Sequence, residues 1–283
     1  MRESRGWRLG VVADAHSAPP GAEPYVWQNT VDLPHSTELL DAGLHWLAAQ
    51  QLDALVLLGD LTEAADPASF TAICERATAL GVPVFAVPGN CDVDPVDRSL
   101  TAFDTIQREE IVTGPDLVPA GPNQILELVH LAAADERRLR GVRRPEAGVP
   151  SHAVRVVLTH YPVLELESDL LAAGFRHSGD LTNRVQIEAD LHALDVPVVV
   201  VHGHLHVHDA RISGNLLHLS CGPLIEPPHL VSVIELDSTD GHIMVQRRAH
   251  SVRTDDVERL PVFAPFDQRW TWSGGSWDLG VWS

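Results

Sequence analysis

The amino-acid sequence predicts an α/β protein in which a mainly parallel sheet is followed by a second, more antiparallel sheet. Strand-like and helix-like stretches alternate over residues 9–87, an order typical of parallel strands joined by crossover helices. Side chains that can bind metal ions follow the ends of several strands. After residue 210, short strand-like stretches follow one another without a helical pattern between them, which indicates the second sheet.

The first part of the chain contains three strand-like runs separated by two helix-like stretches. The runs are short and apolar, and the stretches between them repeat apolar residues at helical spacing. Pro67 begins the second helix and Gly81 follows its end, as is common at helix boundaries. The expected order is strand Leu9–Ala13, helix Ser36–Gln50, strand Ala54–Leu58, helix Pro67–Leu80 and strand Val82–Val87.

The remainder of the chain is expected to hold six strands and one further helix. The helix covers about Asn183–Leu194 and precedes a run of valines. The strands are Gln124–Leu131, Ala153–Thr159, Val196–His202, Leu216–Ser220, Leu230–Leu236 and His242–Ala249.

We expect one large domain over residues 1–261, with two insertions, and a short C-terminal tail. The first insertion, residues 17–35, is rich in proline, glycine and polar side chains, and the second covers residues 132–151. The tail, residues 262–283, carries four tryptophans. It would cover apolar surface either on its own domain or on a second subunit, which leaves open a homo-oligomer formed through the tail.

The charge balance restricts the partners of the protein. The chain has 39 acidic residues against 20 basic ones, all of them arginine, which gives a net charge of −19. Such a chain repels a phosphate backbone, so general nucleic-acid binding is disfavoured. The three separated cysteines do not form a disulfide framework, and no apolar run is long enough to span a membrane. We therefore expect a cytoplasmic protein.

Oxygen and imidazole ligands follow five separate strands. The carboxyl ends of strands in α/β sheets are where ligand sites gather. Each match alone has an ordinary explanation, because Gly-Asp and Gly-Asn are common turns and a lone histidine is usually a core or loop residue. Five matches in order favour a shared metal site instead. The residues are Asp14, His16, Asp60, Asn90, Asp92, His160, His204 and His206.

These motifs resemble those of the calcineurin-like metallophosphoesterases. The matching segments are Asp14-x-His16, Gly59-Asp60, Gly89-Asn90-x-Asp92, His160 and Gly203-His204-x-His206, within about residues 8–236. The Thr-His-Tyr-Pro sequence around His160 is closer to the branch of cyclic-nucleotide phosphodiesterases and purple acid phosphatases than to the protein phosphatases. The resemblance implies a four-layer α/β/β/α sandwich.

The resemblance also implies two divalent metal ions. Asp14, His16, Asp60 and His206 would hold one ion, and Asp60, Asn90, His160 and His204 would hold the other, with Asp60 bridging them. This mixture of carboxylate, amide oxygen and imidazole suits Mn²⁺, Fe or Zn²⁺.

Cys91 departs from the family pattern. The segment Asn90–Asp92 is expected to be catalytic, but most members have a histidine in place of Cys91, and that histidine is thought to bind phosphate and protonate the leaving group. A thiol is shorter and a poor acid unless its pKa is perturbed. The alternative is that Cys91 is a small, partly buried residue without a catalytic role.

Three further residues are candidates for substrate binding. Tyr25 and Trp27 lie in the first insertion and would stack on a nucleobase, although pinning the loop to the domain is the favoured explanation. His177 lies in a glycine-containing loop after His160.

The second insertion holds the only dense group of arginines: Arg137, Arg138, Arg140, Arg143 and Arg144. They would bind a phosphate-rich substrate or partner, or else form surface pairs with neighbouring acids, which is the favoured explanation.

The function that the resemblance implies is a dinuclear phosphohydrolase acting on a small-molecule phosphate ester. A hydroxide held by the metals would attack a phosphodiester, such as a cyclic or modified nucleotide. The alternatives are a phosphomonoesterase acting on small metabolites and a non-catalytic metal-binding scaffold on the same fold. A complete set of metal ligands favours an enzyme, because scaffolds of the family often lose ligands.

Overall fold

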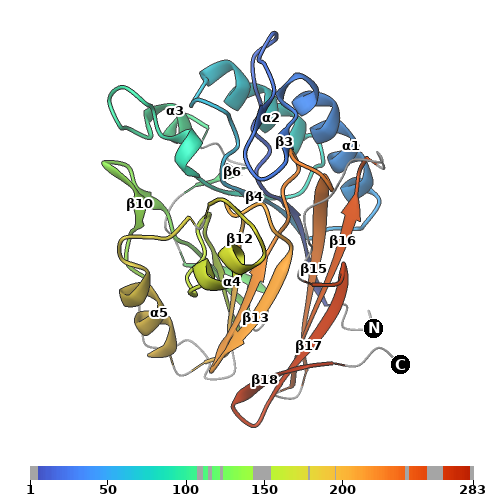
Figure 1. The fold of residues 1–283 in the computed structure, drawn as a ribbon. Helices are drawn as coiled ribbons and strands as arrows, with labels where there is room; N and C mark the ends of the chain where they lie inside the picture. Colours follow the sequence, from blue (N-terminus) through green and yellow to red (C-terminus); the bar gives the residue numbers. More distant parts are fainter. Residues whose placement is uncertain are drawn as a thin grey trace.

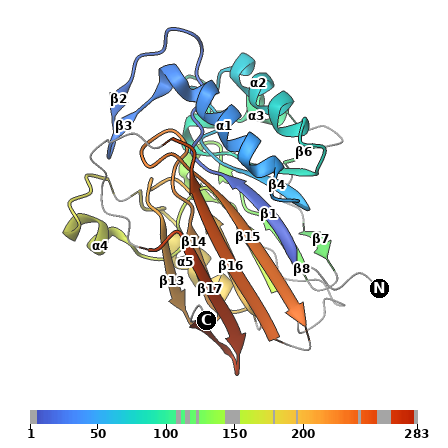
Figure 2. The same cartoon turned by 90° about the vertical axis from the view of Figure 1, so that its right-hand side faces the viewer.

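The computed structural model describes residues 6–106, 111–113, 117–121, 124–142, 154–177, 179–194, 196–239, 242–253 and 264–280. Figures 1 and 2 show two large sheets with helices on their outer sides. Arg143 and Arg144 lie outside the described residues.

The first sheet has eight strands in the order β18-β17-β16-β15-β1-β4-β5-β6. Its strands are β1 (Trp7–Val12), β4 (Ala54–Leu58), β5 (Val84–Val87), β6 (Ile111–Val112), β15 (Leu230–Thr239), β16 (His242–Ser251), β17 (Asp267–Ser273) and β18 (Ser276–Leu279). The pairs from β1 to β6 are parallel, and those from β1 back to β18 are antiparallel.

The second sheet has six strands in the order β13-β14-β12-β11-β8-β7. Its strands are β7 (Leu117–Gly121), β8 (Gln124–Leu128), β11 (Val154–Leu158), β12 (Val198–His202), β13 (Asp209–Ser213) and β14 (Leu216–Ser220). The central pairs are parallel, and both edge strands pair antiparallel. Two small hairpins accompany the sheets: β2 (Tyr25–Val26) with β3 (Thr30–Val31), and β9 (Leu131–Ala132) with β10 (Asp135–Leu139).

The late strands do not form a separate antiparallel sheet, so that expectation was wrong. β13 and β14 complete the second sheet, whereas β15 to β18 extend the first sheet by pairing with β1. A strand pattern in the sequence identifies buried faces but does not specify the pairing partner, which depends on tertiary contacts.

The helices complete four layers. They are α1 (Ser36–Ala48), α2 (Pro67–Thr78), α3 (Thr101–Asp104), α4 (Glu167–Ala172) and α5 (Arg184–His192), with 3-10 turns η1 (Leu33–His35) and η2 (Asn90–Asp92). Figure 1 places α1 and α2 on one side of the molecule and α5 on the other.

The layers are joined by strands whose side chains pack alternately against the layer on either side. In β12, Val198 and Val200 pack in the cluster that contains Ile187 of α5, whereas Val199 packs in the cluster between the sheets. Successive side chains of a strand point to opposite faces, so one strand serves both clusters. The four-layer α/β/β/α class predicted from the sequence is therefore confirmed.

The described part of the C-terminal tail packs on its own domain. Trp270 of β17 and Trp277 of β18 are buried in the cluster between the sheets, at 2% and 3% exposure. The Trp277 indole N–H donates to the carbonyl of Asn215 at 2.9 Å. Most of the apolar surface of these two tryptophans is thus already covered within the chain.

Candidate metal centre

The candidate ligands converge where strands of both sheets end. Asp14 and His16 follow β1, Asp60 follows β4, and Asn90 begins the turn after β5. Backbone hydrogen bonds join these loops: the His16 N–H donates to the carbonyl of Asp60 at 2.9 Å. His160 follows β11 in the second sheet, and its carbonyl accepts from Gly203 N–H at 3.1 Å. The His204 N–H, after β12 of the second sheet, donates to Asp14 Oδ1 at 3.0 Å, so the loops of the two sheets meet at one edge of the sandwich.

Several of these residues adopt a left-handed backbone conformation. Asp14, His16, Asp60, His204 and His206 have φ values of 50°, 43°, 45°, 68° and 55°. Positive φ is uncommon for residues other than glycine, and strained conformations of this kind persist where the surroundings fix them, often at functional sites. The strain at this edge is an observation independent of the residue types.

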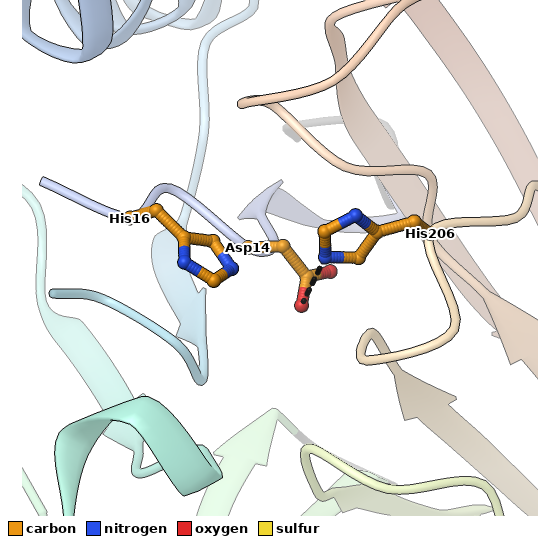
Figure 3. A group of neighbouring side chains, drawn as sticks. All are labelled: Asp14, His16 and His206. Atoms are coloured by element: carbon orange, nitrogen blue, oxygen red, sulfur yellow. Dashed lines mark ion pairs between the residues drawn. The ribbon is translucent and has the colours of Figure 1, made fainter. Parts of the chain in front are cut away.

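Asp14, His16 and His206 form the first group. Their ligand atoms lie within 4.8 Å of one another. The carboxylate of Asp14 lies between the two imidazole rings, as Figure 3 shows. His206 Nε2 is 3.6 Å from Asp14 Oδ1. All three side chains are buried, so their polar atoms need a partner other than bulk water.

Asp60, His160 and His204 form the second group. Their ligand atoms also lie within 4.8 Å of one another. His160 Nε2 is 3.4 Å from Asp60 Oδ1 and 3.2 Å from His204 Nδ1. Two imidazole nitrogens and a carboxylate oxygen thus face a common point, as ligands of a cation do.

Asp60 connects the two groups. Its Oδ1 faces His160 in the second group, whereas its Oδ2 lies 3.6 Å from His16 Nε2 in the first. A second link joins Asp14 Oδ1 to His160 Nδ1 at 3.9 Å. One carboxylate oxygen directed to each group is the geometry that a bridging ligand requires.

Asn90 adds an amide oxygen beside these groups. Its Oδ1 is buried and has no hydrogen-bond partner among the described residues. Its Nδ2 donates to Cys91 Sγ at 3.4 Å, which fixes the side chain with the oxygen free to accept. An orphaned buried oxygen beside two carboxylate–imidazole groups fits a metal ligand, since buried polar atoms are otherwise paired.

The electrostatics of the centre favour bound cations. Burial alone would lower the pKa of His16, but Glu63 and Asp60 raise it to about 9. Burial likewise opposes protonation of His160, but Asp60 raises the pKa of His160 to about 9. The carboxylates therefore attract positive charge strongly enough to hold protons on two buried imidazoles, and a divalent ion would displace those protons.

Two glutamates that the sequence analysis did not identify lie beside the Nδ1 atoms of His16 and His206. Glu63 Oε2 is hydrogen-bonded to His16 Nδ1 at 2.7 Å, whereas Glu226 Oε2 lies 3.2 Å from His206 Nδ1 without the geometry of a hydrogen bond. Such carboxylates fix the tautomer and orientation of metal-binding imidazoles. Glu226 is fully buried, yet no sequence motif marks it. Glu63 lies three residues after Asp60, which is the only sequence signal for its role.

Asp92 does not face the two groups. Its carboxylate accepts hydrogen bonds from the backbone N–H groups of Gly89, Leu61 and Thr62 at 2.8, 3.0 and 2.9 Å. These bonds join the loops after β4 and β5. Asp92 therefore holds the loops that carry Asp60 and Asn90 in place, rather than pointing into the centre.

Cys91 borders the centre with both its backbone N–H and its sulfur. Its backbone N–H donates to Asp60 Oδ1 at 2.8 Å, and a third candidate group joins it with His16 and Glu63. Burial and the neighbouring Asp60 raise the pKa of the thiol well above its ordinary value. The thiol is therefore neutral and a weak acid, as the sequence analysis expected for a cysteine here.

Glycines permit the close approach of the loops. A Cβ atom on Gly89 would lie 2.0 Å from Asp60 Oδ1, and one on Gly203 would lie 2.6 Å from Asp14 Oδ2. Both distances are far shorter than a van der Waals contact. The glycines of the Gly-Asn and Gly-His motifs thus make room for the carboxylates.

The three candidate substrate-binding residues lie at the rim of the centre. Trp27 stacks on His177 with ring centroids 3.8 Å apart, and the Tyr25 hydroxyl donates to Glu63 Oε2 at 3.4 Å. The Gln28 side chain also donates to the carbonyl of His177 at 3.3 Å. These contacts join the first insertion to the loops after β4 and α4, so the aromatic residues pack against neighbouring loops and also border the centre.

Two adjoining cavities open at the centre. The smaller one is lined by both groups of ligands together with Tyr25 and Trp27. The larger has a volume of about 440 Å³. Trp27, Asn90 and His204 line both cavities, so the larger one adjoins the centre.

Comparisons with known proteins agree with this arrangement. A family model described as a calcineurin-like phosphoesterase superfamily domain matches residues 7–239. The fold is similar to a dimetal phosphatase from Danio rerio, with 14% identity, a TM-score of 0.62, and coverage of 88% of this chain and 98% of that one. It is also similar to a purple acid phosphatase from yellow lupin, with 14% identity, a TM-score of 0.52, and coverage of 87% and 52%.

A protein from Thermus thermophilus shares the fold as well, with 14% identity, a TM-score of 0.52, and coverage of 88% and 100%. No curated protein sequence matches the chain. In the described ranges, each helix is too short or too polar to pass through a lipid bilayer.

Proposed function

Because the chain belongs to the calcineurin-like phosphoesterase superfamily and is thus a metal-dependent phosphoesterase, we propose that it hydrolyses a phosphodiester of a small molecule at a two-metal centre. Asp14, His16, Asp60 and His206 would hold one ion, and Asp60, Asn90, His160 and His204 the other. The observation that carries this proposal is Asp60, whose two carboxylate oxygens face different groups of ligands.

The donor set supports a pair of borderline metal ions. Carboxylate, amide oxygen and imidazole together suit Mn²⁺, Fe or Zn²⁺. When bound, two such ions would neutralise the phosphate, activate a water and stabilise both sides of an in-line displacement.

The residues of the chain supply the positioning. Glu63 orients His16 through a hydrogen bond, Glu226 places a buried carboxylate 3.2 Å from His206 Nδ1, and Asp92 fixes the two loops that carry Asp60 and Asn90. The Cys91 thiol is held protonated by burial, since the pKa of the thiol is raised, which argues against a cysteine nucleophile. The displaced group would leave as a stable anion or take its proton from solvent.

The larger cavity supports a diester over a monoester. A diester keeps a second organic arm on the reacting phosphate, and a cavity of about 440 Å³ that adjoins the centre provides space for that arm. A phosphomonoesterase acting on small metabolites is the second candidate, because a phosphate dianion would also suit two metal ions. The complete set of candidate ligands argues against a non-catalytic scaffold.

The test combines elemental analysis with a substrate screen. Purified protein is analysed for bound metals and then assayed with matched p-nitrophenyl mono- and diesters in the presence of added Mn²⁺. We expect about two metal equivalents per chain and a preference for diesters. A preference for monoesters would select the second candidate, and full metal loading without turnover of any ester would contradict the proposal.

A further inference from the structure

We infer that the larger cavity binds a second phosphate group of the substrate, located on the arm that stays with the reacting phosphate. This inference rests on the proposed function and names the substrate class: a phosphodiester whose retained arm carries another phosphate. Three arginines line the cavity, Arg98, Arg137 and Arg176, against one acidic residue, Glu136.

The positive lining contrasts with the rest of the chain. The protein has a net charge of −19, so a cavity with more arginines than acids is not a consequence of composition. Positive side chains in a concave site concentrate an anionic ligand there, whereas the acidic surface elsewhere repels it. The field of the protein therefore directs a multiply charged anion to the metal centre and its adjoining cavity.

The three arginines come from separate segments. Arg98 lies in the loop after η2, Arg137 in β10 and Arg176 in the loop after α4. Arg98 has a left-handed backbone with φ of 59°, and its N–H donates to the carbonyl of Asp94 at 3.0 Å. Convergence of three segments on one cavity, one of them through a strained backbone, indicates a built site rather than a run of surface charges.

Two of the guanidinium groups keep their charge available. Arg137 donates through Nε and Nη2 to the carbonyl of Asp180 at 3.2 and 2.8 Å, which orients the group without neutralising it. The Arg176 backbone is held by Gln28 Oε1 at 3.0 Å, and within the described ranges its guanidinium has no hydrogen-bond or ion-pair partner. Of the three, only Arg98 is paired with a carboxylate of a described residue, that of Glu136.

The chemistry of these groups favours phosphate. A guanidinium donates in a planar fork that matches phosphate oxygens, and a terminal phosphate offers three oxygens where a carboxylate offers two. The cavity is joined to the metal centre through Asn90 and His204, so one molecule can occupy both. The stacked pair of Trp27 and His177 also lines the cavity and would contact an apolar or aromatic linker between the two phosphates.

The experiment uses p-nitrophenyl phosphodiesters that differ only in the retained arm. One arm is butyl, and the others are alkyl chains of varied length that end in a phosphonate or in a carboxylate. In each case water adds to phosphorus and p-nitrophenolate leaves, so kcat/KM is compared at equal leaving-group quality. We expect the best phosphonate arm to raise kcat/KM over butyl by about tenfold or more, as charge-assisted hydrogen bonds supply.

Substitutions then locate the effect. Arg176→Gln and Arg137→Gln should each bring the phosphonate-to-butyl ratio down toward one. Arg138→Gln is the matched control, because Arg138 lies next to Arg137 on β10, is exposed and does not line the cavity. It removes the same charge and should leave both substrates unchanged.

The outcomes separate this inference from the proposed function. Turnover of the butyl diester without any phosphonate preference would overturn the second phosphate site and leave the phosphodiesterase intact. A stronger preference for the carboxylate arm, or an equal loss of preference in Arg138→Gln, would also overturn it. Absence of turnover with every diester would instead reject the proposed function itself.

Discussion

The floor and the rim of the centre are built differently. The floor consists of the ligands at the strand ends, which are mostly buried, and five of them have a left-handed backbone. The rim consists of Tyr25, Trp27, His177 and the three arginines of the larger cavity, which lie on loops and two short hairpins and are more exposed. The difference indicates that the chemistry is fixed by the scaffold, whereas the substrate is chosen by segments that can vary without disturbing the fold.

The strongest test of this division changes Asp60, the residue that connects the two groups of ligands. Asp60→Asn keeps the shape of the side chain but removes the charge that faces both groups of ligands. We expect metal content to fall and kcat/KM to drop by more than about a thousandfold, because several kcal/mol of transition-state stabilisation depend on the metals. Metal analysis and steady-state kinetics measure both effects. A variant that keeps two metals and full activity would contradict the claim that the chemistry depends on the ligands at the strand ends.

A smaller effect is expected from Glu226, the buried carboxylate beside the ligand His206. Glu226→Gln removes the buried charge that lies 3.2 Å from His206 Nδ1 and should weaken metal binding or activity by about 10- to 100-fold, as for other carboxylates beside metal-binding histidines. Glu235→Gln is the control, because Glu235 pairs with Arg8 away from the centre. A metal titration compares the two. Equal metal affinity in both variants would show that Glu226 only fills space.

Cys91 lies between the two regions. Its sulfur accepts a hydrogen bond from Asn90 Nδ2, and its side chain lines the smaller cavity. Cys91→Ala should keep the metal content and reduce the hydrolysis of activated esters by less than about tenfold, measured by kcat. A loss beyond about a hundredfold, on the scale that general acids supply, would make the thiol catalytic.

The smallest effect is expected at the outer rim. Tyr25→Phe removes the 3.4 Å hydrogen bond to Glu63 but keeps the ring. Because Glu63 retains its shorter contact with His16, we expect kcat/KM to change by no more than about fivefold, the equivalent of one hydrogen bond. Parallel kinetics of the wild type and the variant give the result. A larger loss of kcat/KM together with reduced metal content would show that Tyr25 supports metal binding.

The residues of the floor were predictable because each lies directly after a strand-like run. The sequence patterns placed Asp14, His16, Asp60, His160 and His206 at one edge before any pairing was known. The prediction that they bind two metals stays a prediction, and the structure supplies the close grouping that it requires.

The rim and the supports were not predictable in the same way. Glu226 has its role only because the loop after β14 passes behind His206, and Arg176 lines the cavity only because the loop after α4 meets β10. Asp92 shares a motif with Asn90 but turns toward backbone N–H groups instead. A motif gives the spacing of side chains along the chain and does not give their directions.

By itself, the sequence determined most central strands of the two sheets, the helices α1, α2 and α5 and the residues at the strand ends, because periodic burial and turn chemistry involve neighbours along the chain; it did not predict the edge strands β13, β17 and β18. Only the tertiary structure decided that β15 to β18 join the first sheet, that two glutamates lie beside the histidines and that three distant arginines share a cavity. These contacts join residues far apart in the sequence. Their formation depends on how the two sheets pack, and no local pattern records that packing.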